Sequence, residues 1–190
     1  MKYELWARKR KIKFKNEYHL SNALYELRKE GVNFFRNSFD YISAFDANGS
    51  IVHYRPLPST STIFKNQSLL LIDSGAHYLE GTTDVTRVLK LYSPVKKKIK
   101  SAYTYLLKSL LKLEKAHFPL NLLASDLDFF IRSFLQKYNI NYGHGTGHGV
   151  GYFNDVHEKY PIISPSSNQK ILNGNFFSIE PGFYVPHEFG

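Results

Sequence analysis

The sequence of 190 residues predicts an α+β domain that is built from two similar halves. Two stretches have helical periodicity, and each is followed by shorter β-branched and aromatic runs that Gly, Pro and Asn interrupt. The helical stretches are residues 2–31 and 96–138, and the strand-rich regions are residues 38–92 and 140–190. A helix-then-strand plan therefore occurs twice, in halves of about 1–93 and 94–190.

The helical prediction rests on apolar residues that recur at spacings of three and four. In the first stretch they are Leu20, Leu24 and Leu27, and in the second they include Leu106, Leu110, Leu113, Leu127, Ile131 and Phe134. The two stretches end near Gly31 and Asn139, residue types that accept the left-handed conformation of a helix cap. We therefore expect a helix to end at each of these positions.

An internal repeat supports the division into halves. LRKEGVNF begins at residue 27 and resembles LQKYNINY, which begins at residue 135, so the offset is 135 − 27 = 108. NQSLLLIDSG begins at residue 66 and resembles NGNFFSIEPG, which begins at residue 173, an offset of 173 − 66 = 107. Two matches at nearly the same separation indicate a repeated structural unit.

The repeat puts acidic residues at matching places. Asp73 ends the apolar run LLLID and Glu180 ends FFSIE, so pseudo-two-fold packing would bring the two carboxylates face to face. A hairpin through Tyr78–Leu79 would also place Asp84 beside Asp73. Adjacent carboxylates repel one another, and a divalent cation removes that repulsion. The alternative is structural: an ion pair between Asp84 and Arg87, with a capped turn at Asp73.

The run GHGTGHGVG, residues 143–151, holds two histidines between five glycines. Glycine disfavours a helix, so we predict an extended segment with His144 and His148 on one face. At about 3.3 Å per residue the two histidines lie about 13 Å apart, which indicates two different roles. The alternative interpretation is a glycine-rich loop whose histidines are incidental.

Three acids and one histidine form a set of ligands without sulfur. Asp73, Asp84, Glu180 and an imidazole from the glycine-rich run suit Mn²⁺, Co²⁺ or Zn²⁺, and several carboxylates suggest two ions. Two metal ions about 3.5–4 Å apart can activate a shared water and polarise a carbonyl, as they do in aminopeptidases. The residues alone therefore point to metal-assisted hydrolysis.

Composition restricts the other classes of function. The chain has no cysteine, no secretory signal and no apolar run of membrane-spanning length, so we expect a soluble cytoplasmic protein without a membrane partner. The net charge is +9, with basic runs at residues 8–15 and 96–100. Neither run lies near a module that reads bases, so nucleic-acid binding is the weaker interpretation.

Three motifs resemble those of a known family. DSGAHYLEGTTDVTR, HGTGHGVG followed by VHE, and SIEPGFY are similar to the metal-site motifs of the pita-bread metallopeptidases, most closely the Xaa-Pro aminopeptidases. The similarity runs from about Asn37 to Gly190. GTTDVTR together with HGTGHGVG favours this branch over prolidase and methionine aminopeptidase. The resemblance implies a curved antiparallel sheet, two divalent ions, with manganese ahead of cobalt or zinc, and peptides with proline in second position as substrates.

The resemblance also implies a role for each site residue. The implied metal ligands are Asp73, Asp84, His148 and Glu180. The implied substrate-side histidines are His53, His144 and His157, and the implied catalytic groups are His144, His157 and Glu180. Glu180 would also steady the attacking water.

The chain departs from the family pattern at its end. Family members continue past this point into a strand with a last glutamate that bridges both metals, and Glu188 is a poor substitute for it. We therefore expect residues 1–190 to form an incomplete catalytic domain without its last strand, which binds metal weakly or binds one ion and has little activity. The exposed edge would pair with a second copy or with a complementing C-terminal chain. A non-catalytic binding protein with the same fold is the alternative.

Overall fold

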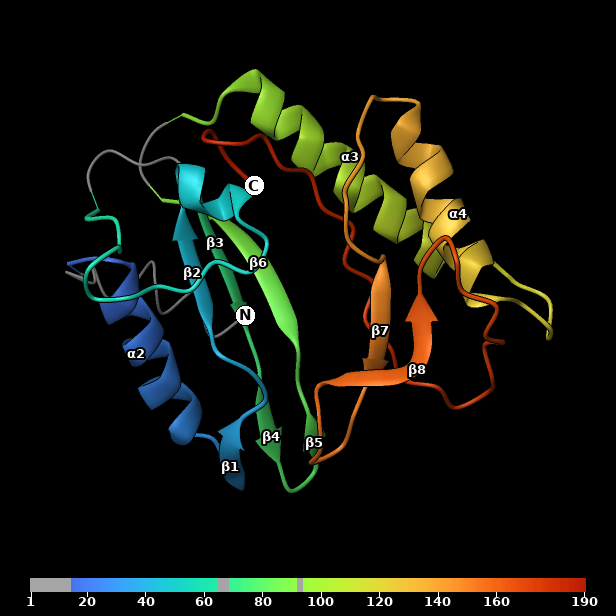
Figure 1. Ribbon diagram of the computed structural model, residues 1–190, viewed down its shortest axis with the longest axis horizontal. Coiled ribbons are helices and arrows are strands. Elements are labelled where there is room, and N and C mark those ends of the chain that lie inside the picture. Colours follow the sequence, from blue (N-terminus) through green and yellow to red (C-terminus); the bar gives the residue numbers. More distant parts are fainter. Residues whose placement is uncertain (1–14, 65–68, 92–93) are drawn as a thin grey trace.

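The computed structural model describes residues 15–64, 69–91 and 94–190, and its strand pairs are all antiparallel (Figure 1). The helices are α2 (Glu17–Lys29), η1 (Asp46–Ser50), α3 (Lys97–Glu114) and α4 (Ala124–Gln136). The strands are β1 (Phe34–Asn37), β2 (Ile42–Phe45), β3 (Leu69–Ser74), β4 (Ala76–Tyr78), β5 (Gly81–Thr82), β6 (Val85–Lys90), β7 (Gly147–Val150) and β8 (His157–Ile163). They form sheets in the orders β1-β4-β5, β2-β3-β6 and β7-β8.

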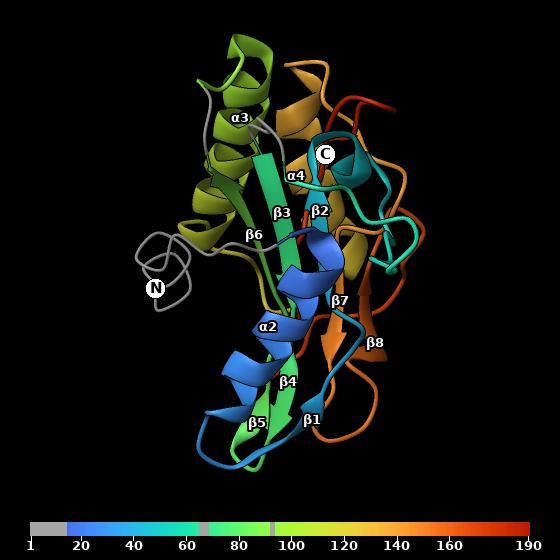
Figure 2. The ribbon, with the colours of Figure 1, turned by 90° about the vertical axis from the view of Figure 1, so that its left-hand side faces the viewer.

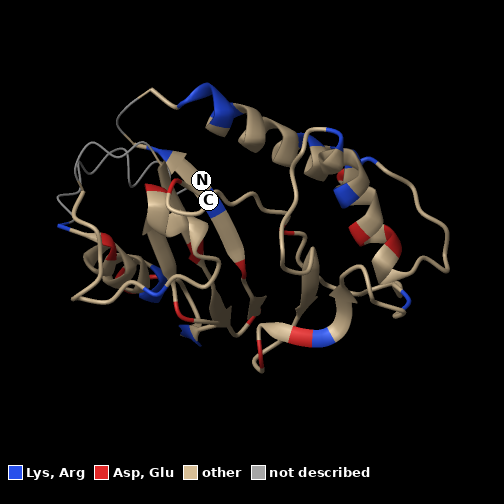
Figure 3. Cartoon of the chain, turned by 45° about the horizontal axis from the view of Figure 1, so that its top comes forward, with Lys and Arg blue, Asp and Glu red and all other residues tan. Residues whose placement is uncertain are grey.

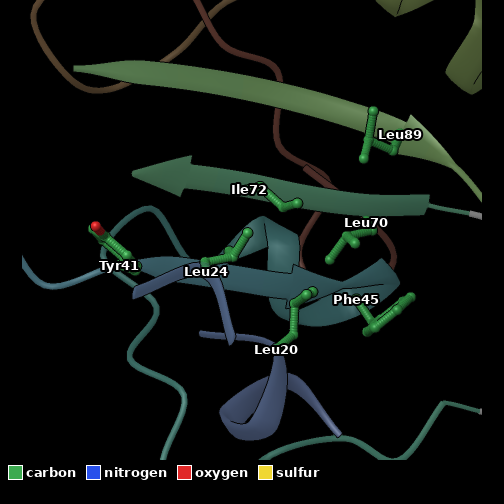
Figure 4. Close-up of a cluster of buried hydrophobic side chains, with 7 residues drawn as sticks. All are labelled: Leu20, Leu24, Tyr41, Phe45, Leu70, Ile72 and Leu89. Atoms are coloured by element: carbon green, nitrogen blue, oxygen red, sulfur yellow. The ribbon is translucent and has the colours of Figure 1, made fainter. Parts of the chain in front are cut away.

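In the first half, α2 packs against the sheet β2-β3-β6. Asn16 caps the helix by accepting a hydrogen bond from the backbone N–H of His19 at 3.0 Å. The apolar face of α2 meets side chains of all three strands, as Figure 4 shows. The cluster consists of Leu20, Leu24, Tyr41, Phe45, Leu70, Ile72 and Leu89. This core holds β3, the strand that carries Asp73, in a fixed position.

In the second half, α3 and α4 pack together beside β7 and β8 (Figures 1 and 2). Ile131 and Leu135 of α4 are fully buried with Ala102 of α3. The same cluster includes Tyr142, which precedes the glycine-rich run, and Tyr184, which follows Glu180. The helices therefore support the segments on both sides of the site.

A smaller cluster joins the two halves. Leu69 of β3, Ile99 of α3 and Phe189 near the last residue are all less than 10 % exposed and pack together. The first half and the end of the chain thus share buried contacts. These contacts hold the acid-bearing segments of the two halves against each other.

Two details differ from the sequence-based prediction. The helical stretch 96–138 is divided into α3 and α4 by a loop that contains Pro119, which has no N–H to continue a helix. After α2 the left-handed residue is Asn33 (φ 59°) rather than Gly31, whereas Asn139 (φ 55°) is left-handed as predicted. The antiparallel pairing agrees with the prediction, and the strands are divided among three short sheets. Residues 2–14 of the first predicted helix lie outside the described residues.

Figure 3 shows lysines at the start of α3, where the basic run 96–100 lies. Lys98 forms an ion pair with Glu188 at 3.7 Å, while most of the run 8–15 lies outside the described residues. Among the described helices, none is long and apolar enough to cross a membrane.

Candidate metal centre

Asp73 and Asp84 lie close together because β3 and β6 are paired. Asp73 is opposite Thr86 in the register, and Asp84 immediately precedes β6. Burial raises the pKa of Asp73 to about 6, and the negative charge of Asp84 adds to the increase, while a hydrogen bond from Thr86 opposes it. One carboxylate oxygen of Asp73, Oδ1, is buried without a hydrogen-bond partner. The hairpin prediction is thus confirmed, and burial beside Asp84 disfavours the charged form of Asp73.

His148 on β7 faces these acids from the other half. Its Nδ1 lies 2.9 Å from the carbonyl oxygen of Gly149, so Nδ1–H donates and Nε2 points away from the strand. Nε2 lies 3.3 Å from Asp84 Oδ2 and 3.1 Å from Glu180 Oε1. Burial by itself lowers the pKa of His148, but the hydrogen bonds to the two acids outweigh it and raise the pKa to about 10. These contacts favour the protonated imidazole of His148 between two carboxylates.

Glu180 is positioned by pairing of residues 176–180 with β7. The backbone N–H of Glu180 donates to the carbonyl of Thr146 at 2.8 Å, and that of Ser178 donates to the carbonyl of His148 at 2.8 Å. Ser178 Oγ also donates to Glu180 Oε1 at 2.7 Å. Burial favours the neutral acid, yet the hydrogen bonds from His148 and Ser178 prevail and lower the pKa of Glu180.

The glycines let these segments approach one another. A Cβ atom on Gly147 would lie 2.0 Å from the carbonyl oxygen of Ser178, and one on Gly149 would lie 2.2 Å from that of Tyr160. Both sides of β7 are thus in contact with neighbouring backbone. The predicted strand is realised only as β7, which carries His148 into the group of acids, whereas residues 143–146 with His144 lie outside any strand.

Two of the three predicted substrate-side histidines, His144 and His157, lie beside this group, and His53 does not. His144 Nδ1 lies 2.7 Å from the carbonyl of Gly145, and its Nε2 accepts a hydrogen bond from the hydroxyl of Tyr184 at 2.8 Å. Burial, together with the charges of Glu180 and Asp73, raises the pKa of Tyr184 to about 12, so the phenol stays protonated. The exposed ring of His157 lies 4.4 Å from that of His148. Among the residues that the structure describes, no contact joins His53 to this group.

The structural alternatives for the acids are not realised. Arg87 donates to the carbonyl of Thr86, and Asp84 pairs with His148 instead. Glu188, the poor substitute for a ligand, pairs with Lys98. Ser74, next to Asp73, is buried and accepts a hydrogen bond from Arg28.

The residues present fit divalent cations by their chemistry. The buried Oδ1 of Asp73 lacks a partner, and carboxylate and imidazole ligands suit first-row divalent metals. In residues 15–64, 69–91 and 94–190, no group of three or more such side chains converges closely enough to hold an ion without adjustment. Loss of the His148 proton would free Nε2 as a ligand atom.

Sequence reasoning missed several residues that support the site. Tyr184 and Ser178 contact His144 and Glu180, and Arg132 of α4 contacts the glycine-rich run. Tyr184 lies within the motif SIEPGFY, so its place in that motif was a usable signal. Nothing in the local pattern around Arg132 distinguishes it from an ordinary helix-surface arginine.

Comparison with known proteins gives consistent matches. The family model described as Metallopeptidase family M24 matches residues 4–190. A probable Xaa-Pro aminopeptidase P of Paracoccidioides lutzii is 40 % identical over 195 residues, which are 100 % of this chain and 32 % of that protein. One of Podospora anserina is 41 % identical over 92 % of this chain and 26 % of that protein. The chain thus spans about a third or less of these relatives' length.

Solved structures resemble the whole chain. The crystal structure of X-prolyl aminopeptidase from Caenorhabditis elegans, described as a cytosolic enzyme with a di-nuclear active site, matches with a TM-score of 0.91 and 35 % identity, covering 100 % of this chain and 31 % of that one. Prolidase from Pyrococcus furiosus matches with a TM-score of 0.84 and 26 % identity, covering 97 % of this chain and 53 % of that one.

Proposed function

The chain belongs to metallopeptidase family M24, and on that premise we propose that it contributes the catalytic centre of an aminopeptidase that removes the residue before a proline in second position. The observation that carries the proposal is the meeting of His148 with Asp84 and Glu180, which come from different halves of the fold. The unpartnered carboxylate oxygen of Asp73 beside them supports a cationic ligand.

We assign Asp73, Asp84, His148 and Glu180 as the ligands of two divalent ions, with manganese as the first candidate and cobalt or zinc as alternatives. When bound, such ions supply an activated water and polarise the scissile carbonyl. The hydrogen bond from Nδ1–H of His148 to Gly149 supports the assignment, because it leaves Nε2 as the ligand atom.

The remaining roles belong to groups around these ligands. The lowered pKa of Glu180 keeps it ionised at neutral pH, so its carboxylate can accept a proton from the attacking water. His144 and His157 are assigned to contact the peptide, because His144 is held by Tyr184 and His157 lies beside His148. His53 would need its loop to move toward the site to take the same role.

The test is metal content together with hydrolysis of Xaa-Pro-Xaa tripeptides. We expect Asp84→Asn to lose metal and to lower kcat/KM at least about 10²-fold, because it removes a charged ligand. Asp40→Asn is the matched control: Asp40 is 77 % exposed and pairs with Arg55 away from the site. A metal-free protein with unchanged hydrolysis would remove the proposal.

Prolidase is the second candidate, favoured by the match to a prolidase structure. Cleavage of Xaa-Pro dipeptides but not of longer peptides would select it, and cleavage of Met-Ala peptides would select methionine aminopeptidase. Binding of peptides without hydrolysis by the metal-loaded protein would support a non-catalytic role.

The cellular location and the assembly of the chain are also part of the proposal. We propose a cytoplasmic location, supported by the related enzyme described as cytosolic. The weak activity predicted for residues 1–190 alone stays a prediction, and a side-by-side assay with a chain extended beyond Gly190 tests it. Sedimentation of both forms tests the predicted pairing with a second copy or a complementing chain.

A further inference from the structure

A buried ion pair on α4 lies outside the group of acids yet contacts the backbone that leads to it. Arg132 Nε donates to both oxygens of Asp128, at 3.0 and 2.9 Å. The side chain of Asp128 is 2 % exposed and that of Arg132 is 20 % exposed. A pair this deeply placed is costly unless its remaining hydrogen-bonding groups are satisfied.

The partners of those remaining groups all belong to residues 141–146. Arg132 donates from its terminal nitrogens to the carbonyl of Tyr142 at 2.8 Å and to that of His144 at 2.7 Å. Another bond reaches Asn141 Oδ1 at 3.1 Å, and the guanidinium carbon lies 4.0 Å from the centre of the Tyr142 ring. One planar side chain thus holds two carbonyls that flank a glycine.

Asp128 holds the other end of the same segment. Thr146 is fully buried, and its hydroxyl donates to Asp128 Oδ1 at 2.5 Å. The hydroxyl of Tyr142 in turn donates to Thr146 Oγ1 at 2.6 Å. Two side chains one helical turn apart therefore contact both ends of residues 141–146, the segment that enters β7 (Figure 1).

This segment needs external support because its own sequence provides little. Gly143 and Gly145 flank His144, and glycine leaves the backbone with more conformational freedom than any other residue. A Cβ atom on Gly143 would meet nothing within 4 Å, so local packing does not restrain it.

We propose that Arg132, oriented by Asp128, is a positioning residue that sets the backbone of residues 141–146 and thereby the place of the His144 imidazole. The inference rests on the proposed function, which assigns His144 to the peptide. The hydrogen bonds of Arg132 reach Asp128, Asn141 and the backbone carbonyls of Tyr142 and His144, so it acts on the His144 ring through the backbone that carries it.

The test is Arg132→Lys in the metal-loaded protein. Lysine keeps a positive charge beside Asp128, but one ammonium group cannot replace the planar fork that reaches Asp128 and both carbonyls. We expect metal content to be unchanged, kcat to fall about 10- to 100-fold and KM to change less than about threefold. The matched control is Arg55→Lys, an exposed arginine paired with Asp40, which should keep full activity.

A double-variant comparison separates positioning from general stabilisation. If Arg132 acts through His144, then Arg132→Lys combined with His144→Ala should be no slower than His144→Ala alone, within about twofold. Losses that multiply in the double variant would overturn the inference, since they would show a path that does not involve His144.

Two measurements test the inference without an assay of peptide hydrolysis. Arg132→Lys should shift the ¹⁵N signals of the His144 ring, assigned by their loss in His144→Gln, and speed amide exchange in residues 141–146 about tenfold or more. Unchanged ring signals and exchange would overturn it, even if wild-type protein hydrolyses no peptide and the proposed function fails. If Arg132→Lys does not fold, Asp128→Asn is measured in the same way, because asparagine still accepts from Thr146 but loses the charge that orients Arg132.

Discussion

The two halves carry their acids on differently supported segments. β3, which ends near Asp73, is paired on one side with β2 and on the other with β6, whereas residues 176–180, which carry Glu180, pair with β7. Among the described residues no strand lies along their other edge. The side chain of Asp84 is 14 % exposed and that of Glu180 is 39 % exposed. Strand pairing on both sides therefore encloses Asp73 on β3, while hydrogen bonds from His148 and Ser178 position the glutamate.

The halves also differ in how a helix holds its neighbouring loop. In the first half, the fully buried carboxylate of Glu17 on α2 accepts hydrogen bonds from Phe45 N, Asn48 Nδ2, Tyr54 OH and Thr62 N at 2.6–3.0 Å. In the second half, Asp128 on α4 is paired with Arg132. Here the arginine, and not the acid, contacts the loop backbone, by donating to the carbonyl of His144. A lone carboxylate only accepts hydrogen bonds and so holds N–H and O–H groups, whereas an arginine only donates and so holds carbonyls.

Replacing an acid in each half should have the largest effect. Glu180→Gln and Asp73→Asn are both expected to lose metal and to lower kcat/KM about 10²- to 10³-fold, because each removes an anionic ligand. In the metal-free protein the two variants should differ, since Asp73→Asn relieves a buried charge and Glu180→Gln removes a favourable partner of His148. Metal analysis, tripeptide hydrolysis and urea denaturation test this. Equal changes in stability would contradict the contrast between the halves.

Removal of the buried Glu17 carboxylate in the first half should destabilise the fold. Glu17→Ala would leave several buried donors without a partner and should lower the free energy of unfolding by about 4 kcal/mol. Glu17→Gln should cost less, because its amide oxygen still accepts. Glu26→Ala is the control, since Glu26 on the same helix is exposed and pairs only with Lys29. A cost for Glu17→Ala no greater than for the control would show that this network contributes little.

The raised pKa of Asp73 predicts a pH dependence in the metal-free protein. A folded-state pKa of about 6 against an ordinary value of 3.8 means that folding favours the protonated acid. This stabilisation is complete below about pH 4 and is lost as the pH rises to about 6, a change of up to roughly 3 kcal/mol. Asp73→Asn should therefore be more stable than wild type at pH 7 and lose that advantage at pH 4.

Denaturation of both proteins at several pH values measures this difference. The pKa of His148, raised to about 10, acts in the same direction at higher pH, so its stabilisation is lost between about pH 6.5 and pH 10 in both proteins. Metal affinity should show the opposite trend and increase with pH, because ligands bind metal in their deprotonated forms. An advantage of Asp73→Asn that is equal at pH 4 and pH 7 would contradict the assignment to Asp73.

The smallest effect is expected within the glycine-rich run itself. Gly147→Ala would place its Cβ 2.0 Å from the Ser178 carbonyl and should lower the free energy of unfolding by about 2 kcal/mol, because the strands must separate. Gly143→Ala, with open space around it, should change stability by less than about 0.5 kcal/mol. Thermal unfolding of the pair measures the difference, and equal melting temperatures would show that β7 has room to move.

Much of the fold could be predicted because its signals are local. Leucine spacing identified α2 and the residues that form α3 and α4, and the apolar run LLLID identified β3. The division between α3 and α4 was missed although Pro119 marks it, and the left-handed residue after α2 was placed at Gly31 instead of Asn33. Positions of this kind depend on how a chain turns to pack, which periodicity does not report.

The amino-acid sequence by itself determined which groups are available: two acids in corresponding places of the repeat, a third acid eleven residues after the first, a histidine between glycines, and no sulfur ligand. Only the tertiary structure decided which of them meet. His148 pairs with acids 64 and 32 residues away (148 − 84 and 180 − 148), and Arg132 turns toward the glycine-rich run, while His53 stays outside the group. The physical reason is that periodicity reflects contacts within one helix or strand, whereas these meetings depend on the packing of two separately supported halves.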